Sequence, residues 1–382
     1  KTILRTFVGC TAILFGTACM GAVKYVPENM KVELSLKVPG NNAVNYKLHP
    51  DKLENSYFDY EWRSDNKLPI TVFHKVEERD SCMRLTVQLT AAQDVYFNYR
   101  QLLSTGYRHD NCQFYMPGFW YRRNLRSPKK APSFHTSDSW LVREDRLSAP
   151  LTGIFSEKEK RFMTVNRLDD FSMDALATHK EGEIILSGKT SLGFTGFENQ
   201  QGIAMLSFGF PYREAPKSYI RKLTLAPEVE AFQLMKKGES VLLTWEIMES
   251  GADDFSDFIQ HTWEHCYDTY APKPVENSYS IADMKQVLSC FFVNSLVDNQ
   301  PLVYNSGIHL KVSDCERNGQ AEVGFIGRVL LNAFNAWEYG WQSNRKELKV
   351  NSTKIFDSYL KNGFTQAGFF KESVNFDKGY EE

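Results

Sequence analysis

The sequence predicts a large antiparallel β-sandwich followed by α-helical hairpins, in a multidomain chain. From about residue 30 to residue 249 apolar residues recur with a period of two, and from Phe255 onwards they recur at helical spacing. No long helical period interrupts the first stretch, so its strands lack crossover helices and should pair antiparallel. The length of 382 residues is too great for one ordinary domain and suits two.

The first 20 residues have the pattern of a secretory signal peptide and are not expected to belong to the fold. A basic start that includes Arg5 is followed by the apolar run Thr6–Phe15 and by small residues up to Cys19. Cys19 stands where a lipoprotein signal carries its lipidated cysteine, but Gly16 occupies a position that prefers Leu, Val or Ile, so lipidation and plain cleavage both stay open. We expect an exported protein, periplasmic or attached to the outer membrane or cell surface, that meets a membrane only through an anchor at Cys19.

Residues 21–250 form the predicted sandwich. Its clearest strand is Met83–Thr90, where apolar residues alternate with polar ones, as in a strand with one buried face. The other strand candidates are Ile70–Val76, Val95–Tyr99, Arg161–Val165, Glu183–Ser187, Ile203–Phe208, Ser218–Leu225 and Val241–Ile247. About ten strands exceed an immunoglobulin-sized domain and suit a large, curved sandwich.

Residues 251–278 are predicted to form a helical linker. Apolar residues recur at helical spacing over Phe255–Cys266, and Asp253 or Asp254 can cap the start of the helix. Pro272 ends the segment.

Residues 279–382 are predicted to be the start of an α/α helical domain. One helix follows Ser280, a second runs over about Gln320–Tyr339, and a third runs over about Lys346–Lys361 with Gly363 at its C′ position. The last two should form a hairpin with a short connection. These helices either pack on the sandwich alone or belong to a larger helical domain that continues past this sequence, and we favour the second alternative.

Composition excludes some functions. The net charge of −2 and the pI near 6.5 argue against nucleic acid as a partner, because a nucleic-acid binder is strongly basic. Aromatic residues reach 14%, which suits the core of a large β-domain and also suits a sugar-binding cleft. The sequence contains no GxSxG, HExxH, P-loop or helix-opening GxGxxG motif.

Cysteine and histidine spacing predicts neither a metal site nor a cofactor. No CxxC pair is present, so a thiolate zinc site is not expected. Cys82 and Cys112 could pair in an oxidising compartment, although ordinary buried thiols are the default interpretation. His261 and His265 share one helix face without an obvious third ligand. This favours two surface histidines with ordinary hydrogen-bond partners over a metal site.

The segment Phe114–Arg146 is the most unusual part of the predicted sandwich. A long loop inside a β-domain more often has a function than serves only to connect two strands. Its aromatic residues offer stacking faces, and its arginines offer planar forks that match carboxylates. In the alternative interpretation the arginines simply pair with Glu144, Asp145 and neighbouring acids. Arg126 is one of the arginines that offer such a fork, and the substrate-binding candidates here are Trp120, Tyr121, Arg122, Arg123, His135, Trp140 and Arg143.

The order of parts resembles the six-hairpin glycosidase group, in which a β-super-sandwich precedes an (α/α)6 toroid. Ala321–Gly340 is similar to the succession of an outer helix and an inner helix in such toroids. The return through Ile355–Leu360 and Gly363 to Gly368–Phe370 is similar to that succession as well. The resemblance covers the whole layout with loose motifs and identifies no particular family. It implies a toroid that is incomplete in this chain. The order also favours hydrolases, since toroid-type polysaccharide lyases usually place the helical domain first.

In the resembling hydrolases the acid and the base are carboxylates on toroid loops. The loop Tyr304–Asn318 enters the helix that carries Glu322, which is where such enzymes build their cleft. Asp314, Glu316 and Glu322 are therefore the candidate catalytic groups, and His309 is a further substrate-binding candidate. The alternative is that these acids simply favour a helix N-terminus.

Together these features predict glycan processing without a cofactor, with an oligosaccharide or polysaccharide as the partner. The favoured function is a glycoside hydrolase acting on an acidic or branched polysaccharide by carboxylate acid/base catalysis. Two alternatives stay open, a non-catalytic glycan-binding surface lipoprotein and a structural partner of an outer-membrane complex. We further expect the segments 120–146 and 305–318 to face each other across one cleft.

Overall fold

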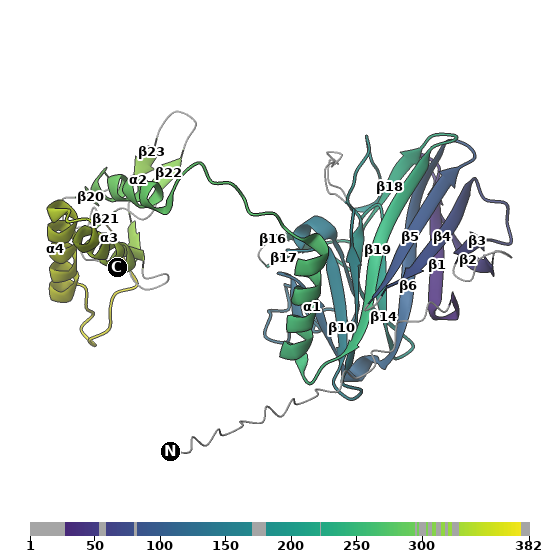
Figure 1. The fold of residues 1–382 in the computed structure, drawn as a ribbon, viewed down its shortest axis with the longest axis horizontal. Helices are drawn as coiled ribbons and strands as arrows, with labels where there is room; N and C mark the ends of the chain where they lie inside the picture. Colours follow the sequence, from purple (N-terminus) through teal and green to yellow (C-terminus); the bar gives the residue numbers. More distant parts are fainter. Residues whose placement is uncertain are drawn as a thin grey trace, which may run out of the picture. The chain divides into compact units, whose positions relative to one another are not determined.

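The computed structural model divides the chain into two compact units, Lys1–Ala271 and Pro272–Glu382. Figure 1 shows the two units, with the strands of the first followed in the chain by the helices of the second. The residues that the structure describes are 27–52, 59–79, 82–169, 181–221, 223–294, 296–297, 303–304, 308–310, 315–317, 320–322 and 328–375. The predicted signal peptide, residues 1–20, lies outside the described residues.

The first unit is a sandwich-like assembly of two mainly antiparallel ladders. The first ladder runs in the order β2 (Val44–Lys52), β1 (Met30–Lys37), β6 (Val95–Arg108), β14 (Ile203–Phe210), β13 (Phe194–Gln200) and β9 (Trp140–Arg143). The second runs in the order β3 (Asp59–Arg63), β4 (Ile70–Glu78), β5 (Cys82–Ala91), β19 (Ser240–Gly251), β11 (Arg161–Arg167), β10 (Leu151–Ser156), β7 (Cys112–Met116) and β8 (Trp120–Arg122). The long strand β2 also pairs with β3 and so joins the two ladders.

Smaller elements complete the first unit. β18 (Val229–Met235) pairs with the start of β6. It also pairs antiparallel with β15 (Arg213–Glu214) and parallel with β12 (Gly182–Ile185). The predicted strand Ser218–Leu225 is a hairpin of β16 (Ser218–Arg221) and β17 (Thr224–Ala226). The described residues of this unit also form three short 3-10 helices, η1 (Pro27–Asn29), η2 (His109–Asn111) and η3 (Glu144–Arg146).

The main core lies between the two ladders. The period-two alternation of the sequence explains it, because every second side chain of β5, Leu85, Val87 and Leu89, is fully buried. Trp245 of β19 meets Tyr99 of β6 and Phe208 of β14, with ring centroids 6.3 and 5.1 Å apart. Aromatic residues therefore fill much of the space between the ladders, as expected for a large β-domain.

The helix α1 (Phe255–Tyr270) packs on the second ladder and belongs to the first unit, whereas residues 251–278 were predicted to form a linker. Asp254 caps it by accepting hydrogen bonds from the backbone N–H groups of Ser256 and Asp257. Phe258 packs against the sheet so closely that a Cβ on Gly153 would lie 2.6 Å from its ring. The burial of this apolar face decides the position of α1.

The second unit contains three helices and three small two-stranded sheets among its described residues. The helices are α2 (Ile281–Asn294), α3 (Arg328–Gln342) and α4 (Lys346–Asn362). The strand pairs are β20 (Leu296–Val297) with β21 (Val303–Tyr304), β22 (Ile308–Leu310) with β23 (Cys315–Arg317), and β24 (Gln320–Glu322) with β25 (Ser373–Asn375). α3 and α4 form the predicted hairpin around Val329, Ala333, Leu348 and Ile355. No helix in the described residues is both long and apolar enough to cross a bilayer.

One local prediction for the second unit was wrong. The helix predicted over Gln320–Tyr339 begins only at Arg328, because Gln320–Glu322 pairs with Ser373–Asn375 as a strand instead. Gly363 directly follows the last helical residue of α4 and is its C-cap, with a φ of −85°. The described residues of this unit contain one α/α hairpin, and a toroid is not shown.

Candidate functional site

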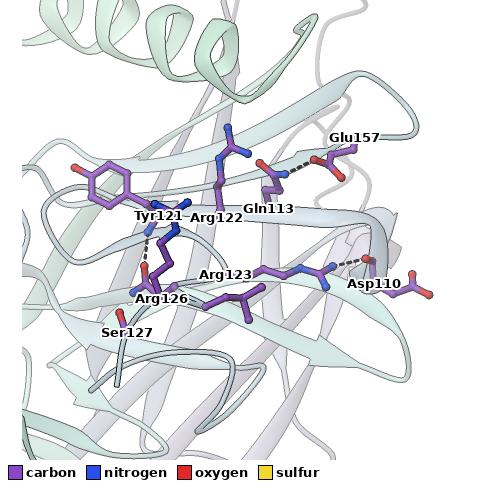
Figure 2. Close-up of a pocket in the computed structure, with 10 residues that line it drawn as sticks. Asp110, Gln113, Tyr121, Arg122, Arg123, Arg126, Ser127 and Glu157 are labelled. Carbon is purple, nitrogen blue, oxygen red and sulfur yellow. Dashed lines mark hydrogen bonds between the residues drawn. The ribbon is translucent and has the colours of Figure 1, made fainter. Parts of the chain in front are cut away.

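A cleft of about 780 Å³ opens on the first unit beside β7 and β8 (Figure 2). Its size is in the range typical of small-ligand sites. Its lining comes from η2, β7, β8, the turn after β8 and the turn after β10. The lining residues are Asp110, Gln113, Tyr121, Arg122, Arg123, Asn124, Leu125, Arg126, Ser127 and Glu157.

The turn after β8 has a strained backbone that the side chain of Asn124 holds in place. Asn124 has a φ of 48° and Arg122 a φ of 58°, in the left-handed region that few non-glycine residues adopt. The Asn124 amide donates to the carbonyls of Phe119 and Pro132 at 3.2 and 3.1 Å, and its oxygen accepts from the Tyr121 N–H at 3.0 Å. Strain of this kind persists only where surrounding contacts enforce it, so the cleft is a built feature of the fold.

Arg123 serves the structure of the cleft wall. Its guanidinium donates to the backbone carbonyls of Cys112, His109 and Asp110. It also lies 5.1 Å from the centre of the Phe134 ring. These contacts occupy the Nε and Nη2 donors, so Arg123 fixes the turn against η2.

Arg122, Arg126 and Tyr121 supply the ligand-facing chemistry. Arg122 is exposed and lies over the Phe255 ring of α1 at 5.1 Å, with no carboxylate at salt-bridge distance among the described residues. Arg126 is exposed and has neither a hydrogen bond nor an ion pair within the part of the chain that the structure describes. The Tyr121 side chain is 51% exposed. Two guanidinium groups without a carboxylate at ion-pair distance in the described part of the chain thus share one cleft with an aromatic face.

The cleft also contains two carboxylates and an amide. Asp110 pairs with Arg108 at 3.4 Å, and the hydrogen bond from Arg108 lowers the pKa of Asp110. Glu157 accepts a hydrogen bond from the Gln113 amide, while the Gln113 amide oxygen is buried without a partner among the described residues. The three arginines outnumber the two acids, so the cleft favours an anionic ligand.

The two tryptophans predicted to bind substrate lie in the core instead. Trp120 is 0% exposed and Trp140 is 1% exposed, with their ring centroids 5.9 Å apart. Their indole N–H groups donate to the carbonyls of Arg122 and Ser137 at 3.0 and 3.2 Å. Both lie on strands, β8 and β9, because burying an indole is more favourable than exposing it in a loop. Neither offers a face to a sugar.

His135 and Arg143 lie outside the lining of this cleft. His135 is exposed and its Nε2 is 2.9 Å from the carbonyl oxygen of Leu125, which fixes the loop. Arg143 donates to both carboxylate oxygens of Asp145, at 2.7 and 2.6 Å, and lies over the Tyr212 ring at 4.9 Å. For Arg143 the structure therefore favours the alternative interpretation, in which the arginine pairs with a neighbouring acid.

Glu144, the other acid in that alternative interpretation, lies in the interior. It is 2% exposed and pairs with Arg167 at 2.8 Å. Burial raises its pKa, against the opposing effect of Arg167. This pair belongs to the interior of the sandwich and does not reach the cleft lining.

The candidates in the second unit are placed only in part. Asp314 lies outside the described residues. His309 in β22 stands opposite Glu316 in β23 in the strand register, and Glu322 ends β24. The structure does not describe these side chains, so their catalytic roles and the predicted shared cleft remain predictions.

Sequence reasoning missed Asp110, Gln113, Asn124 and Glu157. An Asn in a tight turn is a recognisable signal for a left-handed residue, so Asn124 could have been found. The other three come from separate elements, and only the pairing of β7 with β8 and β10 brings them together. The suggested Cys82–Cys112 disulfide is not formed, because both residues are buried free thiols.

Comparison with known proteins does not assign this chain to a family. No protein-family model matches the chain, and no curated protein matches its sequence. A solved polysaccharide lyase is 11% identical with a TM-score of 0.33, over 91% of this chain and 55% of the lyase. A galactose mutarotase-related enzyme from Lactobacillus acidophilus is 12% identical with a TM-score of 0.31, over 58% of this chain and 79% of the enzyme. The chain thus spans about half the length of the lyase, and at such low TM-scores the matches support neither a fold assignment nor a function.

Proposed function

We propose that this chain belongs to an exported glycan-active protein that binds an acidic polysaccharide in the cleft beside β8. The observation that carries the proposal is that Arg122 and Arg126, next to the half-exposed ring of Tyr121, have no carboxylate at ion-pair distance among the described residues. Arginine forks bind carboxylate or sulfate groups with two hydrogen bonds, and an aromatic face packs on the C–H face of a sugar ring.

We further propose that the whole protein is a glycoside hydrolase. In this proposal the second unit is the start of an (α/α)6 toroid, and Asp314, Glu316 and Glu322 include the acid and base. The support is the resemblance in the order of parts and the α3–α4 hairpin. The sandwich cleft would then hold an acidic substituent or branch of the substrate.

A non-catalytic glycan-binding protein is the second candidate. The observation that favours it is the chemistry of the described cleft, which offers donors for anions while its carboxylate Asp110 already pairs with Arg108. The hydrogen bond from Arg108 lowers the pKa of Asp110, which disfavours the protonated form that the general acid of glycoside cleavage needs. On this alternative the protein binds acidic glycans and leaves them intact.

The two candidates separate when the exported protein is incubated with a panel of acidic and neutral polysaccharides. Release of new reducing ends from an acidic polysaccharide is the expected result, and products with unsaturated ends would contradict hydrolysis. Affinity for the acidic members without turnover would establish the binder instead. The intact mass of the same sample shows whether residues 1–20 have been removed.

The role of the cleft is tested by replacing Arg122 and Arg126 together with alanine. We expect at least tenfold weaker binding of acidic polysaccharide, because each charge-assisted hydrogen bond contributes about 1.5–3 kcal/mol. Arg63→Ala on β3 is the matched control, since Arg63 is an exposed arginine that pairs with Asp51 and Glu61. Unchanged binding by the double variant would remove the cleft from the proposal.

A further inference from the structure

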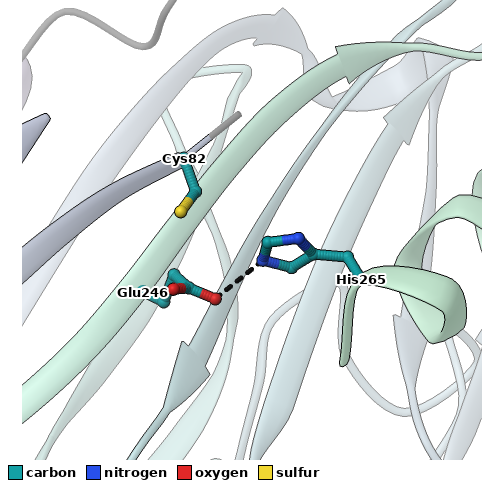
Figure 3. Close-up of side chains that lie close together, drawn as sticks. All are labelled: Cys82, Glu246 and His265. Carbon is teal, nitrogen blue, oxygen red and sulfur yellow. Dashed lines mark hydrogen bonds and ion pairs between the residues drawn. The ribbon is translucent and has the colours of Figure 1, made fainter. Parts of the chain in front are cut away.

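Three side chains with metal-ligating atoms meet where α1 crosses the sandwich (Figure 3). They come from three elements, Cys82 at the start of β5, Glu246 in β19 and His265 in α1. In the register of β5 and β19, Cys82 pairs with Met248, two residues from Glu246. Cys82 and Glu246 therefore share one face of the sheet, and α1 lays His265 over that face.

The three potential ligand atoms lie within 4.8 Å of one another. His265 Nε2 is 2.7 Å from Glu246 Oε1. The hydroxyl of Thr269, one turn further along α1, is 3.0 Å from Glu246 Oε1 and 3.5 Å from His265 Nε2. Small side-chain shifts would let one ion with ligand distances of about 2.0–2.3 Å bridge all three groups.

Two of the three side chains in the cluster are buried, so the cluster is not a chance grouping of exposed residues. Cys82 is 7% exposed and Glu246 is 4% exposed. The His265 side chain is 20% exposed, so solvent can reach the cluster from the side of α1. His261, one turn earlier on α1, faces Asp257 at 3.4 Å and takes no part.

We propose that Cys82 Sγ, Glu246 Oε1 and His265 Nε2 form a binding site for a zinc-type divalent cation. A thiolate, an imidazole and a carboxylate are the ligand types that zinc prefers, whereas calcium and magnesium prefer sets of oxygen ligands. Three protein ligands leave a fourth tetrahedral position, which water or the Thr269 hydroxyl fills. Such an ion joins β5, β19 and α1 and so stabilises the helix against the sheet.

One charged side chain borders the proposed site. Arg84 Nη2 lies 3.7 Å from Glu246 Oε2, so it neutralises the carboxylate oxygen that the ion does not use.

The test is titration of the purified full chain with zinc, followed by calorimetry, thermal unfolding and metal analysis after dialysis. We expect about one zinc ion per chain and a higher unfolding temperature with zinc, because the ion binds the folded state selectively. Cobalt in place of zinc should give the near-ultraviolet charge-transfer band of a thiolate ligand. Calcium and magnesium at the same concentrations should produce no shift.

Matched variants separate the site from adventitious binding. Cys82→Ser and His265→Gln should lower zinc affinity at least tenfold, and Cys82→Ser should remove the cobalt–thiolate band. Cys112→Ser, at another buried free thiol, and His261→Gln, on the same helix, should behave like the unmodified chain. Thermal unfolding without metal shows whether each variant is folded. Zinc binding that survives in both site variants, or no binding by the unmodified chain, would overturn the proposal.

Discussion

The inward-facing and outward-facing side chains of the segment Phe114–Arg146 differ in their partners. Inward, Phe114, Trp120 and Trp140 pack with Phe197 into the core. Outward, Tyr121 and its neighbouring arginines surround an open cleft. The difference teaches that the aromatic richness of this segment mainly supplies the core, so tryptophan content alone is a poor guide to a sugar site.

The outward arginines differ among themselves in the same way. Arg143 is held by the carboxylate of Asp145 and Arg123 by backbone carbonyls, whereas Arg126 has no partner among the described residues. A guanidinium with an occupied fork is part of the fold, and one with an open fork is available to a ligand. The partner decides the role of each arginine.

The largest effect that sharpens this comparison should come from Trp120→Ala. The indole is fully buried between Phe134, Trp140 and Phe197, so its removal leaves a cavity that costs about 3–5 kcal/mol of unfolding free energy. Tyr121→Ala, one residue later and half exposed, should cost less than about 1 kcal/mol. Urea unfolding of the two variants measures both values, and equal losses would break the distinction between the two faces.

A second effect concerns a buried histidine on the inward side of the sandwich. His74 is fully buried with its Nε2 2.8 Å from the Tyr99 hydroxyl, and burial lowers its pKa to about 3. Because the folded pKa lies below the unfolded value of about 6.5, the unfolded chain binds the proton first on acidification. His74 should therefore reduce stability by up to roughly 1.4 kcal/mol per pH unit below about pH 6, until the pH approaches 3.

The measurement is urea unfolding of the unmodified chain and of His74→Gln between pH 7 and pH 4.5. The variant keeps a polar side chain near Tyr99 but does not titrate, so its stability should fall less steeply with acid. Parallel pH profiles would show that His74 is not the group responsible.

The smallest effect should separate Arg126 from Arg143. Arg126→Ala should weaken the binding of an acidic oligosaccharide by about tenfold at low salt, and less at high salt, because the lost interaction is electrostatic. Arg143→Ala should leave the affinity within about twofold, since Asp145 already occupies its fork. Calorimetric titration at two salt concentrations gives both numbers. A larger effect at Arg143 would place the ligand elsewhere than the cleft.

Much of the fold could be predicted from local patterns. The alternation at Met83–Thr90 appears as strand β5, and the helical spacing after Phe255 appears as α1, capped by Asp254, one of the two expected capping residues. The α3–α4 hairpin also follows from its apolar period. Local patterns failed at Gln320–Glu322, where a strand forms because a distant segment of the chain pairs with it.

By itself the sequence determined the class of the predicted strands and of the helical stretches that became α1, α3 and α4, because side-chain period and capping chemistry act within a few residues of chain. It also indicated that the segment 114–146 is unusual. Only the tertiary structure decided that Trp120 and Trp140 are buried while Arg126 has no partner among the residues that the structure describes. Only the packing of α1 on β5 and β19 brought His265 to Cys82 and Glu246, which lie far from it in the sequence. The physical reason is that burial and pairing depend on which faces meet in space, and a single chain segment does not contain that information.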